Sequence, residues 1–214
     1  MILYYGSKTL FEKPTFGVGN ITNDYGLGFY LTPSFDSTKM WAGQFEQDGY
    51  VLKFDVDFKN LNILYLNRNT EEDVLKWITI LVKHRFSLEH REEYKDVIAW
   101  LIRHFDINIE GVDMIIGYRA DDAYFRYAID FVDGKLSIEK LLEAMELGNL
   151  GLQYALMSRK AYSLPKFLGS TKISKSNEYQ EFRKRTAKEY NRLKETEDRY
   201  KNTFIGELMK KYGK

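Results

Sequence analysis

A glycine-framed turn at residues 26–28 constrains the fold more than any other feature of the chain. It belongs to the run Asn-Asp-Tyr-Gly-Leu-Gly-Phe-Tyr-Leu-Thr, residues 23–32. Glycine permits a tight turn, and the aromatic and aliphatic residues that follow favour a strand over 28–31. A strand over 1–6 precedes this run, and a helix over about 37–46 follows it. This order of elements predicts a cleft that suits a flat aromatic amide.

Composition limits the class of protein. The 214 residues are 44% hydrophobic, 15% aromatic and 29% charged, which predicts an ordered, soluble chain with a real core. The absence of cysteine excludes disulfides, zinc thiolate sites and cysteine nucleophiles. The sequence has neither an apolar run of roughly 18 residues nor an N-terminal signal pattern. We therefore expect a cytoplasmic protein that does not bind a membrane.

Helical and strand-like patterns are mixed along the rest of the chain. Apolar periodicity predicts helices over residues 70–82, 89–105, 121–132 and 138–147. Alternating or compact apolar runs predict strands over 50–57, 61–66, 114–116 and 153–157, and a strand or a turn over 166–170. Strands towards both ends with helices between them predict an α+β fold.

The C-terminal region differs from the rest in charge. From residue 172 onward it carries 13 Lys and Arg against 7 Asp and Glu, a net charge of +6, so the remainder carries −5. Residues 177–212 predict one long amphipathic helix, which either packs on the domain or is held for a partner. Its predicted apolar face contains Phe182, Tyr190, Leu193, Tyr200, Phe204 and Leu208. The basic charge suits a nucleic acid or an acidic partner, or it is a solvated helix face.

Five residues near the N-terminus could form a pocket for a planar amide. Gly6 ends the first strand with a bare backbone, whose N–H and C=O fit a primary carboxamide. Tyr30 and Trp41 stand on either side of a strand-to-helix connection and could sandwich a ring. Thr38 precedes Trp41 by about one helical turn, so its hydroxyl could add a hydrogen bond to the carboxamide. Gly28 completes the turn. Together these five residues indicate a pocket for a molecule similar to nicotinamide.

These segments resemble the ADP-ribosyltransferase superfamily in its diphtheria-toxin and poly(ADP-ribose) polymerase branch. In that branch a His-Gly-Ser/Thr motif, a Gly-x-Gly-aromatic-Tyr-aromatic turn, and Ser and Tyr on the next helix follow one another. Here Tyr5-Gly6-Ser7, residues 26–31, and Thr38 with Trp41 stand in the same order. The chain is also similar to a bacterial family of unknown function within that superfamily. The members of that family share segments like residues 23–30 and 117–125.

The resemblance covers about residues 1–170 and implies a fold and a domain organisation. The implied fold is an ADP-ribosyltransferase-like split β-sheet with a helical insert and a long C-terminal helix. The domain would span 1–170 with the insert at about 70–105, and 171–214 would form a basic amphipathic helical tail.

The resemblance also implies an activity that uses NAD⁺ as co-substrate. The branch has a His-Tyr-Glu triad, and its places are taken here by Tyr5, Tyr30 and Gln153. Tyr5 and Ser7 would hold the adenosine ribose, and Gln153 would contact the nicotinamide ribose. Arg119, in a polar cluster with Asp121 and Asp122, could contact the pyrophosphate through a bidentate pair.

Gln153 departs from the glutamate of the branch. A glutamine keeps a hydrogen-bond acceptor but lacks the charge and the basicity, and one such electrostatic contact is worth about 10²–10³ in rate. Three readings stay open: an active transferase with an unusual triad, an NAD- or ADP-ribose-binding module, and an interaction protein that acts through 177–212. Asp121 or Asp122 either caps the next helix or supplies the missing carboxylate.

The resemblance finally implies a macromolecular partner. Small bacterial members of the superfamily are often toxins of toxin–antitoxin or conflict systems, so a protein or nucleic-acid target and an antitoxin are the expected partners. No metal site is predicted, because His84, His90 and His104 lie at no ligand-like spacing with acidic residues.

Overall fold

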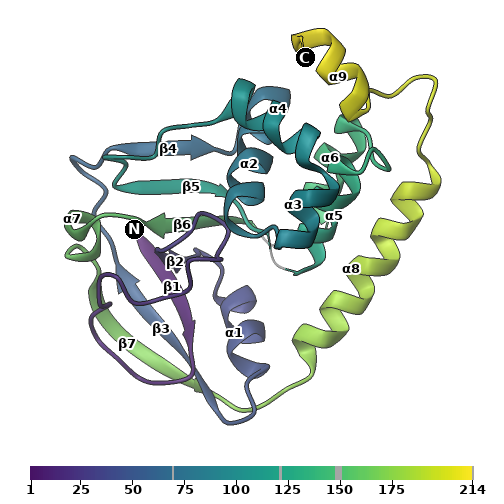
Figure 1. Ribbon diagram of the computed structural model, residues 1–214. Helices are drawn as coiled ribbons and strands as arrows, with labels where there is room; N and C mark the ends of the chain where they lie inside the picture. Colours follow the sequence, from purple (N-terminus) through teal and green to yellow (C-terminus); the bar gives the residue numbers. More distant parts are fainter. Residues whose placement is uncertain (69, 121, 148–150, 214) are drawn as a thin grey trace.

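The strands of the protein form two sheets that lie against a layer of helices (Figure 1). The computed structural model describes residues 1–68, 70–120, 122–147 and 151–213. The first sheet has the strand order β1-β3-β7 and the second the order β2-β6-β5-β4. The predicted α+β class is confirmed. In the part of the chain that the structure describes, no helix combines the length and apolarity needed to cross a lipid bilayer.

The first sheet is antiparallel throughout. β1 (Ile2–Ser7) pairs with β3 (Gly49–Asp55), and β3 pairs with β7 (Lys166–Ile173). The segment 166–170, predicted as a strand or a turn, is therefore part of a strand. The predicted domain boundary at residue 170 falls inside this strand.

The second sheet is mixed and shares the main hydrophobic core with the helices. β6 (Leu152–Leu156) pairs antiparallel with β2 (Phe29–Leu31) on one side and with β5 (Met114–Tyr118) on the other. β5 also pairs in parallel with β4 (Ile63–Leu66). Every residue of β5 is buried, which matches its compact apolar sequence.

A β-bridge connects the two sheets. Tyr4 of β1 donates its N–H to the carbonyl of Thr32 at 2.8 Å, and the N–H of Thr32 donates to the carbonyl of Tyr4 at 3.0 Å. In a strand the N–H and C=O of alternate residues point to the same edge. The N–H and C=O of Gly6 therefore point to this same edge of β1, one step beyond the bridge. The sheets are joined at Tyr4 and separate beside Gly6.

Several helices begin where the sequence supplies a capping side chain. Ser34, Thr70 and Ser137 each accept a hydrogen bond from a backbone N–H in the first turn of the helix that follows. The helices are α1 (Phe35–Gly43), α2 (Glu71–His84), α3 (Leu88–Glu93), α4 (Lys95–Phe105), α5 (Asp122–Val132), α6 (Ile138–Met145), α7 (Arg159–Tyr162), α8 (Glu178–Glu195) and α9 (Ile205–Tyr212). The predicted insert at 70–105 corresponds to α2, α3 and α4. The buried side chains of α2 contribute to the main core between the helices and the second sheet.

The prediction of one long helix over 177–212 is wrong, because α8 and α9 are separate. The connecting segment bonds to the start of α6: Ser137 N–H donates to Glu197 Oε2 and Ile138 N–H donates to the carbonyl of Thr203, each at 2.9 Å. These contacts hold the connecting segment against α6, and α8 ends before it, at Glu195. Tyr200, predicted on the apolar face, lies in this segment and is 100% exposed.

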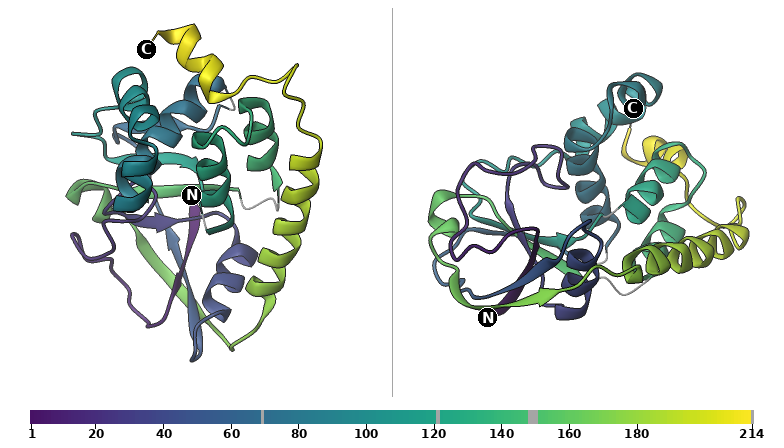
Figure 2. Two further views of the ribbon diagram at one scale, coloured as in Figure 1. Left: turned by 45° about the vertical axis from the view of Figure 1, so that its right-hand side comes forward. Right: turned by 90° about the horizontal axis from the view of Figure 1, so that it is seen from below.

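Both helices of the C-terminal region pack on the rest of the protein. Figure 2 shows α8 running along the outer side of α5 and α6, and the Tyr190 hydroxyl of α8 donates to Asp130 of α5 at 2.8 Å. The Tyr190 ring stacks on Tyr127 with 3.9 Å between the centroids. Beyond α9, the Trp100 indole N–H of α4 donates to the carbonyl of Gly213 at 2.9 Å. The sequence predicts that the tail either packs on the domain or is held for a partner. The apolar faces of α8 and α9 pack on the domain.

Candidate functional site

A cleft of about 520 Å³ opens where the two sheets separate. Its walls come from β1, β2, the loop before β2, α1, and the residues that follow α2 and β5. Its lining contains Tyr4, Tyr5, Gly6, Val18, Gly19, Asn20, Thr22, Asn23, Asp24, Gly28, Phe29, Tyr30, Leu31, Thr32, Thr38, Trp41, Arg85, Arg119, Ala120 and Gln153. Eight of the nine predicted site residues are in this set, although they come from five separate stretches of sequence. Ser7 lies outside the lining, and its hydroxyl accepts the N–H of Thr9 at 3.1 Å.

Gly6 and Trp41 form one wall through a contact that requires glycine. A Cβ atom on Gly6 would lie 2.7 Å from Cδ1 of Trp41 and 3.3 Å from the carbonyl of Thr38. The indole therefore lies directly over the strand, beside backbone groups that face the cleft. The Thr38 hydroxyl donates to the carbonyl of Ser34 at 2.8 Å, so it can offer a ligand its lone pairs and not its proton.

The Trp41 ring is held from two directions. The edge of the ring packs against Tyr179 of α8, with 5.5 Å between centroids and an interplanar angle of 84°. The Arg119 guanidinium lies 5.6 Å from the indole centroid, in the range of a cation–π contact. Arg119 thus places a positive charge beside an aromatic wall, which suits an anionic group of a ligand.

Tyr30 fixes the glycine turn. Its hydroxyl donates to the carbonyl of Gly26 at 2.6 Å and accepts the N–H of Tyr25 at 3.1 Å. Its ring stacks on that of Tyr25 at an interplanar angle of 18°. Burial raises the pKa of Tyr30 well above its ordinary value, so the hydroxyl keeps its proton at neutral pH. Gly28 is needed because a Cβ there would lie 2.9 Å from Met157 Sδ.

Tyr5 lines the cleft from a more apolar setting. Its ring lies 4.6 Å from that of Phe29 and 5.6 Å from that of Phe11, measured between centroids. Burial raises the pKa of the Tyr5 hydroxyl. Tyr5 can therefore act as a neutral hydrogen-bonding group and has no acid–base role near pH 7.

Gln153 lies in the cleft beside a buried carboxylate that the sequence reading missed. The side-chain amide of Gln153 donates through Nε2 to Asp24 Oδ2 at 2.8 Å and to the carbonyl of Tyr118 at 3.1 Å. Gln153 is 6% exposed and Asp24 is 8% exposed. Because both neighbours accept, the nitrogen of the amide must face them and Oε1 faces elsewhere. Asp24 is two residues before the glycine turn. That position is the one feature of the sequence that could have marked Asp24 as a site residue.

Asp24 also connects the loop to the end of α2. Arg85, which follows α2, donates through Nη1 to Asp24 Oδ1 at 2.9 Å and also bonds to the carbonyl of Ala120. The N–H of Ala120 donates to Asp24 Oδ2 at 2.9 Å. Burial raises the pKa of Asp24, and Arg85, the Ala120 N–H and Gln153 oppose that shift. The helical insert therefore contributes a cation to the cleft.

Comparison with known families assigns the chain to a family of unknown function. Residues 1–167 match the model of a family described as a protein of unknown function (DUF3990). The chain belongs to the DUF3990 family. Comparison with curated proteins and with solved structures gave no match. Every lining residue of the cleft lies within the DUF3990 match, whereas α8, which supports Trp41 through Tyr179, lies beyond it.

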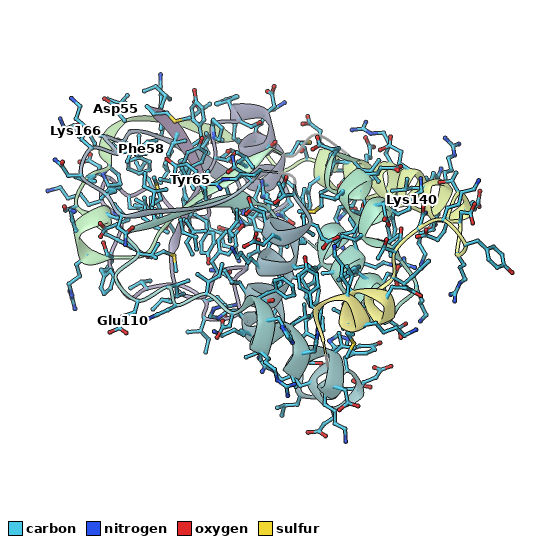
Figure 3. All side chains as sticks on the ribbon, turned by 90° about the horizontal axis from the view of Figure 1, so that it is seen from above. Asp55, Phe58, Tyr65, Glu110, Lys140 and Lys166 are labelled. Carbon is cyan, nitrogen blue, oxygen red and sulfur yellow. The ribbon has the colours of Figure 1, made fainter. Side chains whose placement is uncertain are left out.

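Other features of the molecule offer less chemistry than the cleft. A second hollow, of about 480 Å³, is lined by residues 55–59, Met1 and Lys166 at the sheet end of the protein. Figure 3 labels Asp55, Phe58 and Lys166 there, far from Lys140 at the helical end. Lys59 and Lys166 are exposed, as expected of a solvated surface. Among residues 1–68, 70–120, 122–147 and 151–213, no group of three or more His, Asp or Glu side chains is placed to hold a metal ion.

The two acidic residues considered as a substitute carboxylate are not both described. Asp121 lies outside the described residues, and Asp122 begins α5. The carboxylate that the structure does place beside Gln153 belongs to Asp24.

Proposed function

We propose that this DUF3990 protein is an NAD⁺-dependent ADP-ribosyltransferase that modifies a macromolecular target, with the split β-sheet of that superfamily. One observation carries the proposal: a single cleft gathers Gly6, Tyr30, Trp41 and Gln153 at the point where the two sheets separate. The resemblance in sequence assigns nicotinamide and its ribose to these same residues. The cleft volume of about 520 Å³ lies within the usual range for small-molecule sites.

The strand edge at Gly6 supplies the recognition of the carboxamide. Its N–H and C=O point away from β3, towards the edge where Tyr4 pairs with Thr32. An N–H and a C=O side by side match the acceptor and the donor of a primary amide. Trp41 lies close to Gly6 and lines the cleft together with Tyr30, so either ring can stack on the pyridine ring.

The proposed reaction exchanges one bond at the nicotinamide ribose. The bond between C1 of the ribose and the pyridinium nitrogen breaks, and nicotinamide leaves with the electron pair. A nucleophile of the target bonds to C1 and loses its proton to water or to a neighbouring base. The transition state resembles an oxocarbenium ion, as in glycoside cleavage. Gln153 Oε1, free of the contacts that hold Nε2, can accept a hydrogen bond from the ribose 2′-hydroxyl.

Incubation with NAD⁺ labelled in its adenylate part, together with bacterial lysate, tests the proposal. We expect label on a macromolecule and an equal amount of free nicotinamide. Gly6→Ala is expected to reduce both at least about tenfold, because its Cβ would displace Trp41 and narrow the carboxamide site. Gly206→Ala, on α9, is the matched control. Nothing lies within 4 Å of its Cβ, and we expect full activity.

Two results would contradict the proposal. Binding of NAD⁺ without release of nicotinamide would make the protein a binding module. Equal activity of wild type and Gly6→Ala would place the chemistry outside this cleft.

A further inference from the structure

We infer that Asp24 is the positioning residue of this cleft: its carboxylate holds the Gln153 amide so that Oε1 faces the nicotinamide ribose. The inference rests on the proposed function and adds a residue to it. The family resemblance assigns no role to Asp24. It lies 129 positions from Gln153 in the sequence, and the fold brings the two side chains to 2.8 Å.

The hydrogen bonds of Asp24 suit the ionised carboxylate. Its three partners, Arg85 Nη1, Ala120 N–H and Gln153 Nε2, are all donors. A carboxylic acid would direct its own proton at one of these donors. With three donors converging and 8% of the residue exposed, the site is built for a negative charge.

The state of Asp24 decides which end of the Gln153 amide meets the substrate. With Asp24 ionised, Nε2 is drawn to Oδ2 and to the carbonyl of Tyr118, and the carbonyl oxygen of Gln153 is left for the ribose hydroxyl. With Asp24 neutral, a protonated Oδ2 holds the amide N–H groups less tightly, and a rotated amide can accept the Asp24 proton through its oxygen, at the cost of the bond to the carbonyl of Tyr118. The rotated amide then presents N–H groups to a transition state that is gaining positive charge. The hydrogen bond to a charged acceptor also polarises the amide and strengthens Oε1 as an acceptor.

The surroundings set the pH at which this change occurs. The charged groups that face Asp24 are Arg85 and Arg119, and the other titratable neighbours are Tyr25 and Tyr30. Burial raises the pKa of both tyrosines, so neither ionises below pH 10. Burial raises the pKa of Asp24 above the ordinary value of 3.8. Activity is therefore present above that raised pKa and is lost as the pH falls through it.

The test measures the release of nicotinamide from NAD⁺ between pH 4.5 and 8, in the presence of lysate, for wild type and Asp24→Asn. We expect wild type to lose rate on the acid side. Asp24→Asn is expected to be about 10²-fold slower at pH 7.5 and to lack that acid limb. A purely structural role of Asp24 would lower the melting temperature and leave the acid limb in place.

Asp113→Asn is the matched control. Asp113 is also 8% exposed and accepts from a backbone N–H, of Asn62, and from a cation, Lys160, but it lies at the opposite end of β5. We expect this variant to lose stability and to keep the rate and the acid limb of wild type. An active wild type with an equally active Asp24→Asn variant, or an acid limb that persists in that variant, overturns the inference alone. A wild type that never cleaves NAD⁺ overturns the proposed function, and the role of Asp24 with it.

Discussion

Gln153→Glu is expected to lower the rate of nicotinamide release at pH 7 by about 10²-fold, although glutamate is the residue that the ADP-ribosyltransferase branch carries at the matching place. The reason is the neighbourhood of the side chain. The Nε2 atom of Gln153 lies 2.8 Å from Asp24 Oδ2 and 3.1 Å from the carbonyl oxygen of Tyr118. A glutamate oxygen in its place would lie at about the same distances from these two acceptors. Two buried carboxylates so close cannot both ionise, so one binds a proton. The new glutamate would then face two acceptors, Asp24 Oδ2 and the carbonyl of Tyr118, and would lose the orientation that the amide has.

A double variant separates this repulsion from simple misfolding. Asp24→Asn combined with Gln153→Glu leaves one carboxylate in the pair and returns a donor to face it. We expect the double variant to be at least about tenfold faster than Gln153→Glu alone, measured as initial rates of nicotinamide release at pH 7. Faster turnover by Gln153→Glu than by wild type would contradict this account. It would show that glutamine merely weakens an otherwise ordinary site.

Leu208→Ala is expected to lower the free energy of unfolding by about 2–5 kcal/mol. Leu208 lies on α9 and is 0% exposed, within the main core. Truncation removes buried apolar surface and leaves a cavity that the packed core cannot fill. Urea denaturation monitored by tryptophan fluorescence measures the change, because Trp77 and Trp100 are buried in the same core.

Tyr200→Ala is the control for the C-terminal region. Tyr200 is 100% exposed, and the expected change in the free energy of unfolding is within about 0.5 kcal/mol. A large loss of stability from Tyr200→Ala would contradict the break between α8 and α9. A small loss from Leu208→Ala would show that α9 does not pack on the core.

Local patterns were enough to find most of the elements and most of the cleft. Gly6, Tyr30, Thr38 and Trp41 lie on consecutive elements near the N-terminus, so their spacing alone indicates a common site. The fully buried strand β5 was visible as a compact apolar run before Gly117. Patterns of this kind involve residues that are close in the sequence. Such residues stay close to one another in the folded protein.

The residues that sequence reasoning missed depend on distant partners. Asp24 reads as an ordinary loop residue until Gln153, Arg85 and Ala120 are placed around it. Tyr179 reads as a helix residue until α8 brings it against Trp41. Tyr200 fits the helical period, yet α8 ends at Glu195 and the segment that contains Tyr200 is bonded to the start of α6. In each case a tertiary contact determines the role or the conformation of the residue, and no local sequence pattern predicts that contact.

The structure of the protein with a carbocyclic NAD⁺ analogue, which cannot lose nicotinamide, tests the central claim most directly. We predict that the carboxamide bonds to the N–H and C=O of Gly6 and that the pyridine ring lies against Trp41. We also predict that the 2′-hydroxyl bonds to Oε1 of Gln153, whose Nε2 stays on Asp24. An analogue bound away from Gly6, or a cleft that stays empty at a saturating concentration, would contradict the account.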